Sequence, residues 1–262
     1  MGNRSGVELS TLRRGLEILG LFLDTTTRWD TSRVAQHLGL SKSTTYKYVQ
    51  TLERVGFLVR ELDGRTLRLG PRVLELEQSA RNPDHVADLA YPVLENLVVQ
   101  TNETALLAGR IGNKSVCLAK VESQHNLKLS YRMGETYPLH AGGTAHVLLA
   151  WLDDDALEKL LSSLLFERFT DETIGSAKEL RDRLRSIRAR GYAVSQGELD
   201  AGAFTVAAPV FDRNRSVIAS LSVGGPLQRF DDAKRVMYPE LVCHAAERIS
   251  SLLSNPGGAG GL

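Results

Sequence analysis

The sequence predicts an α+β protein with two domains. Three observations point to this class. The chain has 262 residues, which is long for one hydrophobic core. A helical period gives way to strand-like alternation near residue 57. In the second half, alternating segments are grouped between helical ones, which favours an antiparallel sheet over a doubly wound parallel one.

Composition places the chain among ordinary globular proteins, with 42% hydrophobic and 24% charged residues. The longest apolar run, residues 147–152, is far shorter than the roughly 20 residues that span a bilayer. The N-terminus leads into an amphipathic segment and not an apolar signal core, so we expect a cytoplasmic protein without a membrane partner. Cys117 and Cys243 fit neither a disulfide framework nor a metal-ligand spacing, and we read them as two buried thiols.

Three helices are predicted at the N-terminal end. The first carries apolar residues at helical spacing, Leu12, Leu16, Leu19 and Leu23. Thr31 is expected to cap the second helix, which ends at Gly39, where a left-handed residue is favoured. Ser41 is expected to cap the third, from Lys42 to Val55.

A hairpin follows the third helix. Residues 57–61 and 66–69 alternate as strands on either side of the turn signal Asp63-Gly64. Helices in this order followed by a hairpin indicate a winged helix-turn-helix, over residues 1–70. A linker helix is predicted to begin at Pro71 and to end at Asn82-Pro83, so the linker is expected over 71–83.

The remaining chain predicts the second domain, over residues 84–254, and a flexible Gly-rich tail over 255–262. A long helix begins near Val86. The expected strands are 104–111, 115–121, 127–131, 205–211 and 217–223, and the later helices are 143–151, 177–190 and 231–253.

Charge is concentrated where DNA could use it. Residues 1–80 carry 12 Lys+Arg against 9 Asp+Glu, a net +3, and residues 41–72 carry 7 against 3. Double-stranded DNA is therefore the expected partner, although a single surface Lys or Arg more often only interacts with solvent. The expected contacts are Ser41, Lys42, Ser43, Thr44, Tyr46, Lys47 and Gln50 on the third helix, Arg60 and Arg65 on the hairpin, and Arg13, Arg14 and Arg33 on the first two helices.

These segments resemble the IclR family of bacterial regulators. The resemblance rests on LGLSKSTTY at residues 38–46, LGPRVL at 69–74, KVES at 120–123, PLHA at 138–141, and RGY at 190–192 followed by AAPVF at 207–211. It implies a winged helix joined through a linker helix to a GAF/PAS-like effector domain. It also implies homodimers or homotetramers on palindromic operators.

An effector site is expected in the second domain. Residues 140–145 include two glycines and two alanines, which leave the backbone accessible, and they lead into a helix N-terminus. Such a site suits a carboxylate. The expected effector contacts are Gly142, Gly143, Thr144, Ser195, Ala203, Thr205 and Ser222; the resemblance implies Gly143, Thr144 and the three hydroxyls at 195, 205 and 222. A tight turn at Gly142-Gly143 and hydroxyls satisfied at strand edges are the alternatives.

The effector class is expected to be an organic acid. Family members that bind small keto acids carry an acid, a Cys and a second Ser where this chain has Ser195, Thr205 and Gly224, so that preference does not transfer. Ala203 is smaller than the aliphatic residue that is common there, which suggests an aromatic or larger acid. His140 is expected to be a structural hydrogen bonder and Glu198 and Asp200 solvated acids, and no role is assigned to His146.

The expected function is a ligand-responsive DNA-binding regulator of a catabolic operon. The alternative is a GAF-like enzyme whose N-terminal domain serves assembly. No catalytic motif supports that alternative, since the chain has neither a Gly-x-Ser-x-Gly elbow nor a Walker-type glycine loop. We expect no cofactor, and no metal ligands are assigned. A metal in the second domain is conceivable, but Cys117, His140 and Cys243 would have to meet by folding alone.

Overall fold

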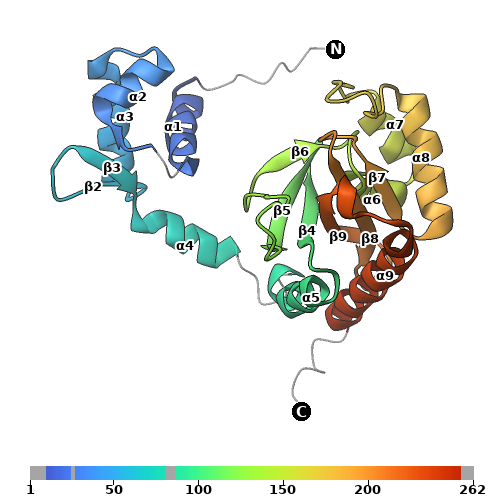
Figure 1. Cartoon of the computed structure of the whole chain (residues 1–262). Coiled ribbons are helices and arrows are strands. Elements are labelled where there is room, and N and C mark those ends of the chain that lie inside the picture. Colours follow the sequence, from blue (N-terminus) through green and yellow to red (C-terminus); the bar gives the residue numbers. More distant parts are fainter. Residues whose placement is uncertain (1–9, 25–26, 81–85, 255–262) are drawn as a thin grey trace. The chain divides into compact units, whose positions relative to one another are not determined.

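The structure is a computed structural model and describes residues 10–24, 27–80 and 86–254. It contains two compact units, one formed by α1 to α4 and the other by α5 to α9 (Figure 1). The end of the expected linker, residues 81–83, and the expected tail, 255–262, lie outside the described residues. Within the described residues, no helix is both long and apolar enough to cross a membrane.

The three N-terminal helices are α1 (Ser10–Gly20), α2 (Thr31–Leu38) and α3 (Lys42–Arg54), with a 3-10 turn, η1, at Leu21–Leu23. Ser41 caps α3 as predicted, because its hydroxyl accepts the N–H of Thr44 at 3.1 Å. The predicted cap of α2 is wrong by one residue. The carboxylate of Asp30 accepts the N–H groups of Ser32 and Arg33, and Thr31 is the first helical residue.

A small antiparallel sheet completes the first unit, in the order β1-β3-β2. The strands β2 (Leu58–Arg60) and β3 (Thr66–Leu69) form the predicted hairpin, and β1 (Trp29–Asp30) was not predicted. Helices and sheet share one buried core, made of Ile18, Trp29, Val34, Val49, Leu58 and Leu67. α4 (Pro71–Ala80) then begins at the proline that the sequence indicated.

The second unit is built on a six-stranded antiparallel sheet in the order β6-β5-β4-β9-β8-β7. Together with the helices it confirms the α+β class. The strands are β4 (Thr104–Ile111), β5 (Lys114–Val121), β6 (Thr136–Pro138), β7 (Ala193–Gln196), β8 (Ala203–Phe211) and β9 (Val217–Pro226). The helices are α5 (Val86–Thr101), α6 (Gly143–Ala150), α7 (Asp154–Leu161), α8 (Ala177–Arg190) and α9 (Asp232–Ser254), with a 3-10 turn, η2, at Leu227–Arg229.

Two hydrophobic cores lie on opposite faces of this sheet. α5 and α9 pack against β4, β8 and β9 on one face, around Leu97, Phe204 and Tyr238. α6 and α8 lie on the other face (Figure 1) and pack together around Leu149 and Leu184.

The register of β5 against β4 shifts at one residue. Ala119 pairs with Leu107 and Cys117 pairs with Ala108, so Leu118 is an extra residue, a β-bulge. The side chain of Leu118 packs with the α5–α9 core. Cys117 and Ser115 consequently lie on the opposite, α6-facing side of the sheet.

The strand predicted at residues 127–131 is wrong. Its carbonyls bond to side chains instead of a neighbouring strand: Leu129 O accepts from Thr104 Oγ1 at 2.9 Å, and Leu127 O accepts from Arg229 Nη1 at 2.9 Å. The strand that pairs with the outer edge of β5, opposite β4, is β6, which was not predicted. β7 and α7 were also missed.

Candidate functional sites

The exposed face of α3 carries the polar side chains that the sequence singled out. Thr45 and Val49 are buried. Ser41, Lys42, Ser43, Thr44, Tyr46, Lys47 and Gln50 are all exposed. At the helix start the Ser41 hydroxyl bonds to the hydroxyls of Ser43 and Thr44, at 3.0 and 2.8 Å. The two lysines have no ion-pair partner among the described residues, so their charges are available to a phosphate.

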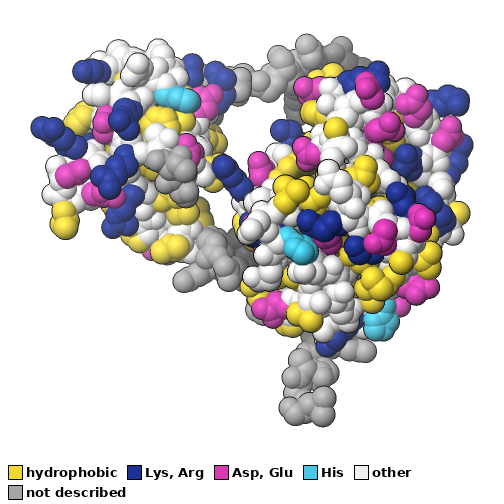
Figure 2. All heavy atoms as spheres, viewed as in Figure 1, with side chains coloured by type: hydrophobic (Ala, Val, Ile, Leu, Met, Phe, Trp, Pro, Cys, Tyr) yellow, Lys and Arg dark blue, Asp and Glu magenta, His cyan; other side chains and the backbone are white. Residues whose placement is uncertain are grey.

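The hairpin presents Arg65 from a rigid tip. The Asp63 carboxylate accepts the N–H groups of Arg65 and Thr66, each at 2.8 Å, and the Thr66 hydroxyl at 2.5 Å. These hydrogen bonds, the Thr66 hydroxyl first, lower the pKa of Asp63 to about 2. The Arg65 side chain is exposed and has no partner among the described residues. Figure 2 shows Lys and Arg side chains, with acids between them, over the part of the unit that carries β2 and β3.

Four of the predicted DNA-contacting arginines form ion pairs or hydrogen bonds within the first unit. Arg60 is half-buried and pairs with Glu53 on α3 at 2.8 Å, so it ties the hairpin to that helix. Arg13 and Arg14 both pair with Glu17 on α1, at 3.4 and 2.8 Å. The Arg33 guanidinium donates to the carbonyl of Arg28 at 2.9 Å.

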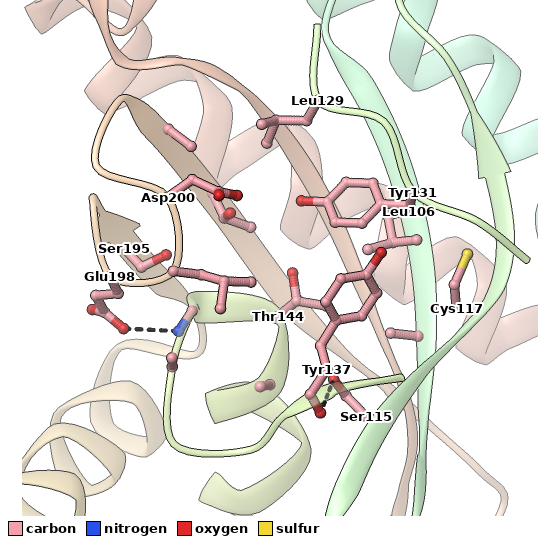
Figure 3. A pocket seen from close by; sticks show the side chains of 17 residues that line it. Leu106, Ser115, Cys117, Leu129, Tyr131, Tyr137, Thr144, Ser195, Glu198 and Asp200 are labelled. Atoms are coloured by element: carbon pink, nitrogen blue, oxygen red, sulfur yellow. Dashed lines mark hydrogen bonds between the residues drawn. The ribbon is translucent and has the colours of Figure 1, made fainter. Parts of the chain in front are cut away.

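A cavity of about 50 Å³, which we call the α6 pocket, lies between the first turn of α6 and the sheet (Figure 3). This volume holds roughly three to five water molecules. Of the seven predicted effector contacts, Gly142, Thr144, Ser195, Ala203 and Thr205 line the pocket and Gly143 and Ser222 do not. The other lining residues are Leu106, Ala108, Ser115, Cys117, Leu129, Tyr131, Tyr137, Ala141, Ala145, Glu198, Leu199 and Asp200.

Gly143 and Ser222, the two predicted residues outside the lining, form hydrogen bonds with residues that line the pocket. The N–H of Gly143 donates to Ser195 Oγ at 2.8 Å, which fixes α6 against β7. Thr144 Oγ1 donates to Ser222 Oγ at 2.9 Å, which fixes α6 against β9. The first turn of α6 is therefore attached to two strands of the sheet.

Glu198 is buried at this turn, so the prediction that it is a solvated acid is wrong. It is 4% exposed. Its Oε2 accepts the N–H of Gly142 at 2.9 Å, as the dashed line in Figure 3 marks, and its Oε1 lies 3.1 Å from Arg183 Nη1 on α8. Asp200, in the same loop, is exposed as expected.

Two histidines extend this buried cluster. His140 Nε2 donates to the carbonyl of Glu167 at 2.8 Å, which fits its expected structural role. His146 Nε2 lies 3.1 Å from the His140 carbonyl and 3.7 Å from Glu198 Oε2. Burial lowers the pKa of His146, while the charge of Glu198 opposes that shift.

The aromatic wall of the pocket was missed by sequence reasoning. Tyr131 and Tyr137 have ring centroids 5.6 Å apart at 81°. Burial, with the charge of Asp200 adding to it, raises the pKa of Tyr131 to about 12, while a hydrogen bond with Thr205 opposes the rise. The Tyr137 hydroxyl donates to Glu135 Oε2 at 2.7 Å. Leu129 and Tyr131 alternate toward the pocket, and this alternation was taken for a strand.

Charge in the α6 pocket is one-sided. Its described lining residues include two carboxylates, Glu198 and Asp200, and no Lys, Arg or His. Cys117 is buried, and burial raises its thiol pKa to about 11. Cys243 is only half-buried. Within the described ranges, no three His, Cys, Asp or Glu side chains are grouped as metal ligands.

Two family models match the chain. Residues 11–62 match the IclR helix-turn-helix domain, and residues 78–251 match the C-terminal domain of bacterial transcriptional regulator IclR. The HTH-type transcriptional regulator KdgR of Dickeya chrysanthemi is 33% identical over 219 residues, which cover 84% of this chain and 72% of that protein. The transcriptional repressor IclR of Escherichia coli is 26% identical over 245 residues, covering 93% and 89%.

Solved structures share the fold. The Thermotoga maritima IclR has a TM-score of 0.78 and 28% identity, covering 94% of this chain and 100% of that one. An IclR homologue from Microbacterium hydrocarbonoxydans, solved in complex with 4-hydroxybenzoate, has a TM-score of 0.80 and 27% identity, covering 93% and 98%.

Proposed function

This chain belongs to the IclR family of bacterial helix-turn-helix transcriptional regulators, and on that premise we propose that a small organic acid bound in the α6 pocket changes its affinity for operator DNA. The pocket carries this proposal, since it brings Thr144, Ser195 and Thr205 from three elements to one cavity. A ligand shifts DNA affinity only when it binds two conformations unequally. The genes it controls are proposed to form a catabolic operon for the acid.

The first turn of α6 supports a carboxylate group on the ligand. A helix N-terminus offers N–H donors and a favourable dipole to an anion. The N–H groups of Gly142 and Gly143 already donate to Glu198 and Ser195. The next N–H, of Thr144, has no acceptor among the described residues, and Thr144 lines the pocket. We therefore place the ligand carboxylate at Thr144.

The size of the pocket favours a ligand with few heavy atoms. A cavity of about 150 Å³ accommodates benzene, whereas the α6 pocket measures about 50 Å³. The 4-hydroxybenzoate in the Microbacterium homologue supports the aromatic class suggested by Ala203. An aromatic acid in this chain would require the lining to move apart.

Thermal-shift and operator-binding measurements with aliphatic and aromatic acids test the effector site. A binding acid should raise the melting temperature of the wild-type protein and alter its operator affinity. The double variant Thr144→Leu, Thr205→Leu should lose both effects, while Thr136→Leu, exposed on β6 outside the pocket, should keep them. Unchanged effects in the double variant would place the ligand elsewhere.

DNA contact is proposed for the exposed face of α3 and for Arg65. Their donors suit base edges and phosphates, which together give specificity and affinity. Tyr46→Ala and Lys47→Ala should each weaken operator binding without changing the melting temperature. Lys178→Ala on α8, an exposed lysine of the other unit, is the matched control. Full operator affinity in both α3 variants would remove that helix from the interface.

A homodimer or homotetramer is proposed as the active form, because palindromic operators require a two-fold protein. An apolar groove in the first unit supports this. Its apolar lining includes Leu12, Leu16, Leu19, Leu52, Val55 and Leu76, and Leu12 and Leu16 are 61% and 59% exposed. Thr44 and Lys47 of α3 also line it, so the groove adjoins the proposed DNA-contacting face. We propose that a second copy covers it, and that the protein acts in the cytoplasm, where operator DNA is.

Catalysis is not proposed for the second unit. A nucleophilic thiol needs a lowered pKa, whereas that of Cys117 is raised to about 11. The alternative of a GAF-like enzyme predicts turnover of a pocket ligand. The test is to incubate the full chain with a ligand that binds to it. If no product forms, the result supports a regulator that has no catalytic activity.

A further inference from the structure

The α6 pocket contains an unneutralised negative charge. Of its two carboxylates, Glu198 is paired with Arg183 and with the N–H of Gly142. The side chain of Asp200 has no such partner among the described residues. Because none of the described lining residues is a cation, a ligand that is only an anion would meet an uncompensated like charge.

The groups facing Asp200 suit an ammonium ion. Figure 3 shows its carboxylate and the Tyr131 hydroxyl turned toward each other across the pocket. The rings of Tyr131 and Tyr137, at 81° to each other, form a corner beside it. An ammonium between them can donate to the Asp200 carboxylate in a charge-assisted hydrogen bond and to the Tyr131 hydroxyl oxygen. A carboxylate and a phenol oxygen that face each other together form a recognition site for a protonated amine.

We propose that the effector is an amino acid or a similar small zwitterion, whose ammonium group lies between Asp200 and the Tyr131 hydroxyl. This inference rests on the proposed effector function of the α6 pocket and adds the ammonium to the carboxylate placed at Thr144. Such a ligand is neutral overall, so it pairs Asp200 without bringing a second net negative charge into the cavity.

Two matched sets of compounds test the proposal by calorimetric titration of the full chain. The small set is propionate, alanine and ethylamine. The aromatic set is 4-hydroxyphenylacetate, 4-hydroxyphenylglycine and 4-hydroxybenzylamine. Within each set the skeleton is shared, and the members carry the carboxylate, both groups or the ammonium alone. In at least one set, the amino acid should bind about tenfold more tightly than the acid, the gain of one charge-assisted hydrogen bond.

Asp200→Asn should bring the affinity ratio of amino acid to acid close to one. Asp155→Asn, an exposed carboxylate on α7 outside the pocket, should leave it unchanged. If the acid binds as tightly as its amino acid in both sets, the zwitterion proposal is wrong, while the proposal of an organic-acid effector is kept. The same conclusion follows if Asp200→Asn leaves the affinity ratio of amino acid to acid unchanged. No binding by any acid or amino acid overturns both proposals.

Discussion

Arg183 and Glu198 form an ion pair, 3.1 Å between Nη1 and Oε1, that joins α8 to the first turn of α6. Glu198 is buried, and its second oxygen holds the N–H of Gly142. A single carboxylate thus connects a surface helix to the backbone beside the proposed effector site. Loss of the Glu198 carboxylate should therefore reduce both the stability of the second unit and ligand binding.

Arg183→Met should lower the free energy of unfolding by about 1–2 kcal/mol, because it leaves Glu198 buried without its cation. The arginine is 35% exposed at its side chain, so the cost lies below that of a fully buried pair. Thermal unfolding measures the change, as a drop of roughly 2–8 °C. Arg185→Met, which breaks an exposed pair with Asp182 on the same helix, is the control. Equal melting temperatures for the two variants would contradict this role of Arg183.

Stability of the second unit should fall as the pH drops below 6.5. Burial holds the pKa of His146 below the value of 6.5 expected in the unfolded chain. The unfolded state therefore binds the proton first, so the stability is present above pH 6.5 and is lost as the pH falls toward the lower folded-state pKa.

Melting temperatures measured across this pH range test the assignment. His146→Gln should flatten the dependence, and His244→Gln, exposed on α9, should preserve it. If the slope survives in His146→Gln, another group is responsible.

Arg65 and Arg60 should behave differently although both lie in the hairpin. Arg65→Ala should weaken operator binding and reduce its salt dependence by about one phosphate contact, with no change in melting temperature. Arg60→Ala should lower the melting temperature, because it breaks the tie to Glu53. Operator titrations at several salt concentrations, paired with thermal melts, separate the two effects. The reverse pattern would exchange the roles of the two arginines.

Leu16→Glu should disrupt the proposed dimer. The substitution puts a charge into the apolar groove of the first unit, where Leu16 is 59% exposed. Sedimentation should show a smaller species that binds a palindromic operator more weakly. Leu62→Glu, on the hairpin and outside the groove, is the control for an added surface charge. A dimer that persists unchanged in Leu16→Glu places the interface on another face.

Local signals in the sequence predicted most of the fold. Ser41, Gly39, Pro71 and the Asp63-Gly64 turn each act on backbone within a few residues, so their effects can be read without tertiary structure. The α7 helix carried the same kind of signal, because the Asp153 carboxylate accepts the N–H of Ala156, but it was not used. Asp30 shows the limit of such reasoning, since a Thr and an Asp at adjacent positions can both cap.

The candidate pocket was less predictable because it is assembled by long-range contacts. Glu198 follows Gly197 in a loop that reads as solvated, and only folding brings Arg183 and Gly142 to it. Tyr131 looked like a strand residue because a pocket wall and a strand both present alternate side chains to one side. Gly143 and Ser222 do not line the pocket; they bond instead to Ser195 and Thr144, which do.

The bulge at Leu118 makes the floor of the α6 pocket depend on how β5 pairs with β4 as well as on composition. With the extra residue there, Cys117 and Ser115 face the cavity. Moving the bulge by one position toward the N-terminus would bring Leu118 to the cavity and turn Cys117 to the other core, without changing a single residue type. Relatives with different ligands can thus diverge through a shift in pairing, and an alignment without gaps would hide it.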